Sequence, residues 1–183
     1  MKFVFVVNRN AGKGRVLKQW TALEARVDEL FDDYEVVFDL APIPRDADVV
    51  VAVGGDGTVH YVVNYLMTSG GGAALGILPL GSGCDFARNF DASDPLAVLA
   101  HGARRQIDIG EIESAGNKMW FANVADAGLG AEVTRQMSSH SRNYLLSTLK
   151  ALLGYKNVEV KLSADDVEIY AGPLKCLVIA NGK

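Results

Sequence analysis

The sequence has little cysteine, no excess of positive charge and no long hydrophobic run, and each absence excludes a class of protein. Its two cysteines, Cys84 and Cys176, lie far apart and fit neither a metal motif nor a disulfide framework, which favours a reduced, cytoplasmic setting. The net charge of −4 argues against a nucleic-acid partner, because neutralising a phosphate backbone requires a basic face. No apolar stretch approaches the ~20 residues of a transmembrane helix, and the apolar start at residues 1–8 is too short for a signal peptide.

What remains is the composition of an ordinary globular chain, with 49% hydrophobic and 22% charged residues. A chain of 183 residues can bury a core in one large or two small domains. Residues 1–104 alternate strand-like and helix-like patterns, which predicts an α/β domain with a parallel sheet. Residues 105–183 read mainly as alternating strands with inserted helices, which predicts an antiparallel β domain.

The most informative stretch is a strand, a glycine-rich turn and a helix. Residues 49–53 are apolar and mostly β-branched, as in a buried strand, and apolar residues return at helical spacing from Val59 to Met67. Between them lie Gly54, Gly55, Asp56, Gly57 and Thr58. Glycines let backbone N–H groups close on a ligand, and the helix N-terminus behind them attracts anions. The pattern predicts a phosphate-binding turn; the alternative is a turn that needs glycine only for close packing.

Two polar side chains of this turn have more than one expected role. Asp56 would repel a phosphate group unless a cation lies between them, so it either helps to hold Mg²⁺ or pins the loop. Thr58 either caps the helix or bonds a phosphate oxygen.

Two further loops follow predicted strands. Residues 8–15, after the strand at 2–7, contain two glycines and three cations and lead into an amphipathic helix. Residues 81–90, after the strand at 75–80, place glycines on both sides of Ser82, and Asp85 can cap the short helix that follows. The carboxyl ends of parallel strands meet at one edge of a sheet, so we expect all three loops to line one crevice.

Basic residues of the first loop are candidates for binding a phosphate group in this crevice. Lys13 or Arg15 could reach it, with Asn8 bridging backbone groups. Solvated loop charges are the alternative interpretation of Arg9 and Arg15.

Other chemically suggestive side chains favour structural roles. Cys84 has no histidine nearby in the sequence and is predicted to be a packed thiol rather than a nucleophile. Asp39 ends the strand predicted at 35–40, where a dinucleotide-binding fold places its ribose acid. Residues 8–15 lack the glycine spacing of that fold and also that of a Walker A loop, so we interpret Asp39 as a loop residue.

The second half carries fewer signals for chemistry. Its predicted elements are a hairpin at 105–113 and 119–124, a glycine turn opening a helix at 125–132, a helix at 144–155, a hairpin at 158–162 and 167–171, and a last strand at 174–180. About five strands without a closing sheet would expose edges and apolar faces. We therefore expect a fragment, a chain completed by a partner such as a second copy in a homodimer, or an unusually small second domain.

Two of these motifs together resemble the diacylglycerol kinase catalytic domain family, which includes bacterial lipid kinases and sphingosine kinases. They are the Gly54–Thr58 turn, GGDGT, and residues 76–88, GILPLGSGCDFAR. Residues 8–12 match the opening motif of the family, and residues 105–112 and 121–130 look like the start of its second domain. The resemblance implies a Rossmann-like nucleotide-binding domain at 1–104, followed at 105–183 by the first part of an antiparallel β-sandwich that binds the lipid substrate.

The resemblance also implies an activity. ATP would bind between the two domains, and its γ-phosphoryl would pass to a lipid hydroxyl at the membrane surface, with Mg²⁺ neutralising charge. The implied ATP-binding residues are Asn8, Gly12, Gly54, Gly55, Asp56, Gly57, Thr58, Val59, His60 and Ser82. The catalytic base is expected beyond Lys183, with Asp56 in a supporting role at most, and metal ligands stay unassigned. A cytoplasmic lipid kinase, peripheral to the membrane, is the first hypothesis.

Departures from the family pattern keep two other hypotheses open. The family usually has Glu at the position of Tyr61 and Asn at that of Cys84, and residues 41–46 are a short Pro-rich connection where a helix is usual. The second hypothesis is a catalytically inactive member that binds nucleotide or serves as a scaffold. The third is a kinase of the NAD kinase type, which shares GGDGT; residues 81–88 and the strand at 108–110 argue against it.

Overall fold

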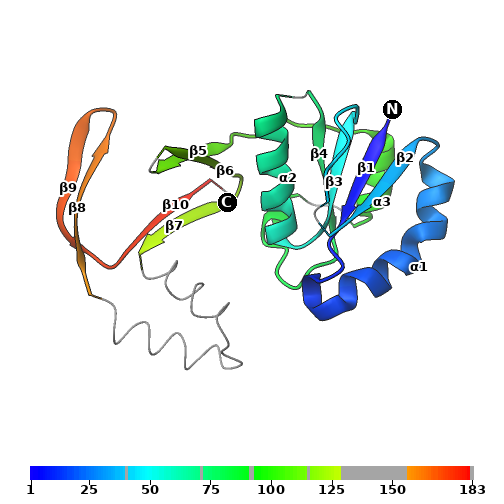
Figure 1. Ribbon diagram of the computed structural model, residues 1–183, viewed down its shortest axis with the longest axis horizontal. Helices are drawn as coiled ribbons and strands as arrows, with labels where there is room; N and C mark the ends of the chain where they lie inside the picture. Colours follow the sequence, from blue (N-terminus) through cyan, green and yellow to red (C-terminus); the bar gives the residue numbers. More distant parts are fainter. Residues whose placement is uncertain (40, 71, 91–92, 115, 129–155, 182–183) are drawn as a thin grey trace. The chain divides into compact units, whose positions relative to one another are not determined.

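The computed structural model describes all residues except 40, 71, 91–92, 115, 129–155 and 182–183 (Figure 1). The described chain forms two compact units, one of residues 1–123 with Asn181 and one of residues 124–180. The domain boundary expected after residue 104 stays a prediction. Within the described residues, no helix is long and apolar enough to cross a bilayer.

A four-stranded parallel sheet forms the centre of the first unit. Its strands are β1 (Phe3–Val7), β2 (Tyr34–Phe38), β3 (Val49–Gly54) and β4 (Ala74–Pro79), in the order β2-β1-β3-β4. Every residue of the two central strands, β1 and β3, is buried, which explains their uninterrupted apolar sequences. The α/β fold with a parallel sheet is therefore confirmed.

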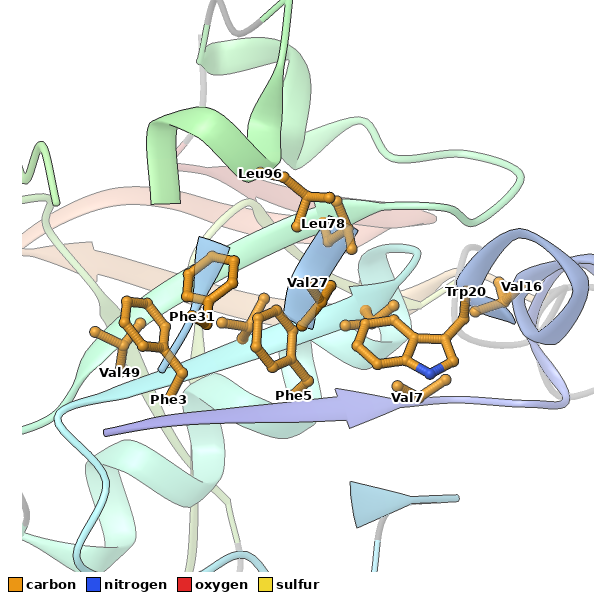
Figure 2. Close-up of a cluster of buried hydrophobic side chains, with 12 residues drawn as sticks. Phe3, Phe5, Val7, Val16, Trp20, Val27, Phe31, Val49, Leu78 and Leu96 are labelled. Carbon is orange, nitrogen blue, oxygen red and sulfur yellow. The ribbon is translucent and has the colours of Figure 1, made fainter. Parts of the chain in front are cut away.

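Helices cover both faces of this sheet (Figure 1). Their bounds are η1 (Ala11–Gly14), α1 (Arg15–Leu30), α2 (Asp56–Ser69), η2 (Phe86–Asn89) and α3 (Pro95–His101). On one face α1 and α3 cover a core that contains the odd-numbered residues of β1; Figure 2 shows Trp20 of α1 beside Phe5 and Leu96 of α3 beside Leu78 of β4. On the other face α2 packs on the even-numbered residues Val4 and Val6. The alternation of side chains along a strand thus builds two separate cores.

The hairpin β5–β6 belongs to the same unit and contacts α2. β5 (Gly110–Ser114) pairs antiparallel with β6 (Asn117–Phe121). The Asn64 side chain of α2 accepts a hydrogen bond from Trp120 N at 3.0 Å and donates to Trp120 O at 2.8 Å. The predicted strand at 105–113 was too long, because it begins only at Gly110 and residues 105–109 form no strand.

The second unit consists of two pairs of strands in its described part. β8 (Val158–Ala164) and β9 (Val167–Leu174) form the predicted hairpin, whose turn residues Asp165 and Asp166 both have positive φ, as a tight hairpin turn requires. The last predicted strand is confirmed as β10 (Cys176–Ala180).

The glycine turn predicted to open a helix from residue 125 was wrong in its described part. Residues Val124–Gly128 form strand β7, which pairs antiparallel with β10. The partner lies about fifty residues further along the chain, so no local pattern could signal it. The helix predicted at 144–155 lies outside the described residues.

Candidate functional site

The turn after β3 requires glycine for steric reasons. A Cβ on Gly54 would lie 2.3 Å from Thr58 Oγ1. Gly55 is the N-cap of α2 and supplies no capping side chain, so the first N–H groups of the helix have no side-chain acceptor from their own cap. Gly57 is exposed in the first turn of α2, and a Cβ there would meet nothing within 4 Å. The helix N-terminus is therefore open above this turn.

The loop after β4 lies directly against this turn. Gly81 N donates a hydrogen bond to Gly54 O at 2.9 Å, and a Cβ on Gly81 would lie 2.4 Å from Gly55 Cα. A Cβ on Gly55 would in turn lie 3.9 Å from Ser82 N. The two glycine loops therefore touch through their backbones, at a distance that only glycine permits.

The loop after β1 joins the same edge through Asn8. Asn8 N donates to Val53 O at 3.2 Å, and Asn8 Nδ2 donates to Thr58 Oγ1 at 3.2 Å. Thr58 is 2% exposed, so its hydroxyl is a buried link between two loops, away from solvent. The three loops therefore meet at one edge of the sheet, as predicted, and the crevice between them stays a prediction.

The two residues after Thr58 point in different directions. Val59 is buried and packs with Val4 and Val6 in the core beneath α2. His60 is exposed on the helix surface, where its ring nitrogen lies 3.4 Å from Asn64 Nδ2. Of these two, only His60 offers its side chain to solvent.

Asp56 holds the loop after β4 in place through two hydrogen bonds. Its Oδ1 accepts from Phe86 N at 2.9 Å and its Oδ2 accepts from Asp85 N at 3.1 Å. The expectation that Asp85 caps η2 was wrong: Asp85 makes no capping hydrogen bond, and its carboxylate instead pairs with Arg88 at 2.6 Å. Asp56 supplies the cap from another loop, and this carboxylate ties α2 to the segment after β4.

These contacts bear on whether Mg²⁺ fits the site. Within the described ranges, no three His, Cys, Asp or Glu side chains gather closely enough to hold a metal ion. Mg²⁺ commonly takes one or two carboxylates and completes its shell with phosphate oxygens and water. The residues present therefore fit an ion that arrives with a phosphate ligand, but not a dedicated protein cage.

Arg9 of the first loop pairs with a carboxylate. Arg9 Nε donates to Asp39 Oδ2 at 2.7 Å, and its guanidinium lies over the Phe38 ring, 5.1 Å from the centroid. This hydrogen-bonded ion pair holds the pKa of the Asp39 carboxyl below its usual value. Asp39 lies directly after β2 in the left-handed region, with a φ of 53°.

Arg15 makes contacts of a different kind. Its Nε donates to Gly12 O and its Nη2 to Ser82 Oγ, both at 3.1 Å. Neither acceptor carries a charge. This side chain joins the loop after β1 to the loop after β4.

Cys84 packs beneath the turn. Its Sγ donates to Gly54 O at 3.5 Å, and burial is the main cause that raises the pKa of the thiol. A raised pKa disfavours the nucleophilic thiolate, which agrees with the prediction that Cys84 is a packed thiol.

Sequence analysis gave loop pinning as one of two roles for Asp56, which the structure bears out, but it did not identify the backbone of residues 85 and 86 as the partner. It missed the Arg15 bond to Ser82 and the Asn64 bonds to Trp120. The partners are 29 to 67 residues apart. The sequence feature that pointed to the Asp56 contact was an acidic residue at the first position of a helix, directly after two glycines.

Comparison with known proteins identifies the family. The family model for the diacylglycerol kinase catalytic domain matches residues 2–112, a span that contains all three loops. This chain belongs to the diacylglycerol kinase catalytic domain family. The resemblance inferred from the two glycine motifs is thereby confirmed.

Individual members of this kinase family are similar over most of the chain. A diacylglycerol kinase of Bacillus subtilis is 29% identical over 74% of this chain and 46% of its own length. A protein of Pseudomonas aeruginosa named "Probable lipid kinase YegS-like" is 36% identical over 73% of this chain and 46% of its own length. The chain thus spans about half the length of the curated relatives that it matches.

Solved structures support the fold. The crystal structure of a diacylglycerol kinase from Bacillus anthracis superposes with a TM-score of 0.69 at 20% identity, covering 99% of this chain and 64% of the other. At this identity the similarity supports the architecture and carries no statement about substrates.

Proposed function

We propose that the chain is the nucleotide-binding part of an ATP-dependent lipid kinase. In the proposed reaction, the γ-phosphoryl of ATP is transferred to the hydroxyl of a diacylglycerol-like or sphingoid lipid at the membrane surface. A bond forms between the lipid oxygen and the γ-phosphorus while the bond from that phosphorus to the bridging oxygen breaks, so that ADP leaves and the hydroxyl proton is released. ATP supplies the phosphoryl group, with Mg²⁺ as the expected counter-ion.

One observation carries this proposal: the backbone contact between Gly81 and Gly55 beneath the open N-terminus of α2. This contact brings the start of α2 and the Ser82 backbone N–H close together. The positive end of the helix dipole adds attraction for an anion there. A polyphosphate is the ligand class that such a turn recognises.

In the proposed complex, the residues of the chain bind and orient the phosphates. The backbone at Gly55, Gly57 and Ser82 donates hydrogen bonds to phosphate oxygens. Asn8, Thr58 and Asp56 contribute indirectly, since their side chains hold the three loops together. Exclusion of water from these N–H groups by the ligand would strengthen each hydrogen bond.

The test is calorimetric titration of the chain with ATP in the presence of Mg²⁺, followed by a phosphate-transfer assay on a panel of diacylglycerol and sphingoid lipids. The informative variant is Gly81→Ala, whose new methyl group would overlap the Gly55 backbone. The matched control is Gly72→Ala, where a Cβ meets nothing within 4 Å. We expect ATP binding by the native chain and by Gly72→Ala, and its loss in Gly81→Ala.

Each outcome has a distinct meaning. A folded native chain that binds neither ATP nor inorganic triphosphate would overturn the proposal. Binding of ATP without transfer to any lipid would favour the second hypothesis, a nucleotide-binding member without catalytic activity. Phosphorylation of NAD would favour a kinase of the NAD kinase type.

A further inference from the structure

Arg15, the first residue of α1, is directed toward the edge where the glycine loops meet. Its two hydrogen bonds, from Nε to Gly12 O and from Nη2 to Ser82 Oγ, fix the orientation of the guanidinium. The residue is nevertheless exposed, so a ligand can reach it. Because both acceptors are neutral, these bonds orient the cation without neutralising it.

Other arginines close to these loops are paired with carboxylates. Arg9 pairs with Asp39, and Arg88 pairs with Asp85. In the part of the chain that the structure describes, Arg15 meets no carboxylate. Its positive charge is therefore the one on these loops that is both held in place and available to an anion.

A guanidinium binds phosphate more strongly than it binds a hydroxyl or carbonyl oxygen, because the acceptor is charged and its geometry allows two parallel bonds. Ser82 Oγ occupies a donor position of Arg15 that a phosphate oxygen could take. A phosphate group at the N-terminus of α2 would lie beside Ser82, since the Gly55 and Ser82 backbones are adjacent. The ligand would thus compete with Ser82 for Nη2.

We infer, on the basis of the proposed function, that Arg15 is a phosphate-binding residue that exchanges Ser82 Oγ for an oxygen of the phosphate chain. The exchange neutralises ligand charge and frees the Ser82 hydroxyl to bond the ligand as well. The ligand class is a polyphosphate, and the adenosine part is not required for this contact.

The first experiment measures the affinity of Arg15→Gln, Arg15→Lys and Arg45→Gln for ATP and for inorganic triphosphate, both with Mg²⁺. Arg45→Gln is the charge-matched control, since Arg45 is exposed on the loop before β3, at the opposite edge of the sheet. Arg15→Gln should weaken both ligands by roughly 10- to 100-fold, the value of a charge-assisted hydrogen bond. Arg15→Lys should recover part of the affinity, because the charge returns without the forked geometry.

A second experiment separates direct phosphate binding from a role in holding the Ser82 loop. Arg15→Gln is repeated in a Ser82→Ala background. If Arg15 binds the ligand itself, the fold-weakening in the Ser82→Ala background is at least as large as in the native background, because no hydroxyl competes there for Nη2. If Arg15 acts only through Ser82, the substitution has no further effect once the hydroxyl is gone.

The results that overturn the inference differ from those that overturn the proposed function. Two results would refute the role of Arg15 but leave the proposed function standing. In the first, the native chain binds both ligands and Arg15→Gln binds them with the same affinity. In the second, Arg15→Gln weakens binding in the native background but not in the Ser82→Ala background. Absence of binding by the native chain refutes both the role of Arg15 and the proposed function. If circular dichroism shows that Arg15→Gln does not fold, the affinity of Arg15→Lys tests the inference instead. An affinity equal to that of the native chain would contradict a forked contact between Arg15 and the phosphate.

Discussion

Replacing Gly57 by Ala should change stability and ligand binding in opposite directions. Gly57 is the second residue of α2, its φ lies outside the left-handed region, and a Cβ would meet nothing within 4 Å. Alanine is therefore tolerated there and removes backbone freedom from the unfolded chain. We expect a gain of about 0.5–1 kcal/mol in the free energy of unfolding. That gain corresponds to a rise of about 1–4 °C in melting temperature.

The same methyl group should weaken phosphate binding. It would project from the first turn of α2 into the space where a phosphate group is proposed to lie. Crowding by one methyl group costs about 1–3 kcal/mol in a close-packed site. This range corresponds to a dissociation constant raised about 5- to 150-fold. Because no atom beyond its own chain neighbours and helix backbone lies within 4 Å of the new methyl group, we expect the loss to come from contact with the ligand.

Thermal unfolding by circular dichroism and calorimetric titration with inorganic triphosphate and Mg²⁺ measure the two effects. Gly72→Ala is the control, because its Cβ also meets nothing but lies just before β4, at the other edge of the sheet. It should leave binding unchanged. A Gly57→Ala chain that is more stable and binds triphosphate as tightly as the native chain would refute the placement of phosphate at the N-terminus of α2.

Three other side chains give further expectations. Asp56→Asn should lower stability by about 1–3 kcal/mol in urea unfolding, because the two backbone N–H groups bond to different carboxylate oxygens and the amide NH2 group would face one of them as a second donor; an unchanged midpoint would contradict the capping role. Trp20→Phe should lower the free energy of unfolding, measured in urea, by less than the ~3–5 kcal/mol typical of losing a buried aromatic ring. The reason is that it also removes a buried indole N–H that has no hydrogen-bond partner among the described residues. A larger loss would contradict an unbonded N–H. A thiol reagent at pH 8 should modify the exposed Cys176 before Cys84, whose pKa is raised by burial, and mass spectrometry showing the reverse order would contradict this.

Local patterns were sufficient for the sheet and its helices. Residues 49–53 could be assigned to a buried strand because apolar β-branched residues run without a break, and β3 is buried throughout. The turn at Asp165 and Asp166 was equally clear, because two adjacent strands share one short connection. Strand β7 could not be assigned in this way, since its partner among the described strands is the distant β10 and its own sequence, rich in Ala and Gly, favours a turn.

The amino-acid sequence by itself determined where the chain must turn sharply. Gly54 and Gly81 stand at points where any side chain would overlap a neighbouring atom, and their spacing after apolar strands identified both the family and the edge of the sheet at which a ligand would bind. The tertiary structure alone decided what the polar side chains of that edge do. The strand order places the loops after β1, β3 and β4 side by side, so Asp56 meets the backbone of residues 85 and 86, and Arg15 meets Ser82. Hydrogen bonds act over about 3 Å, so partners so distant in sequence are specified only by the fold.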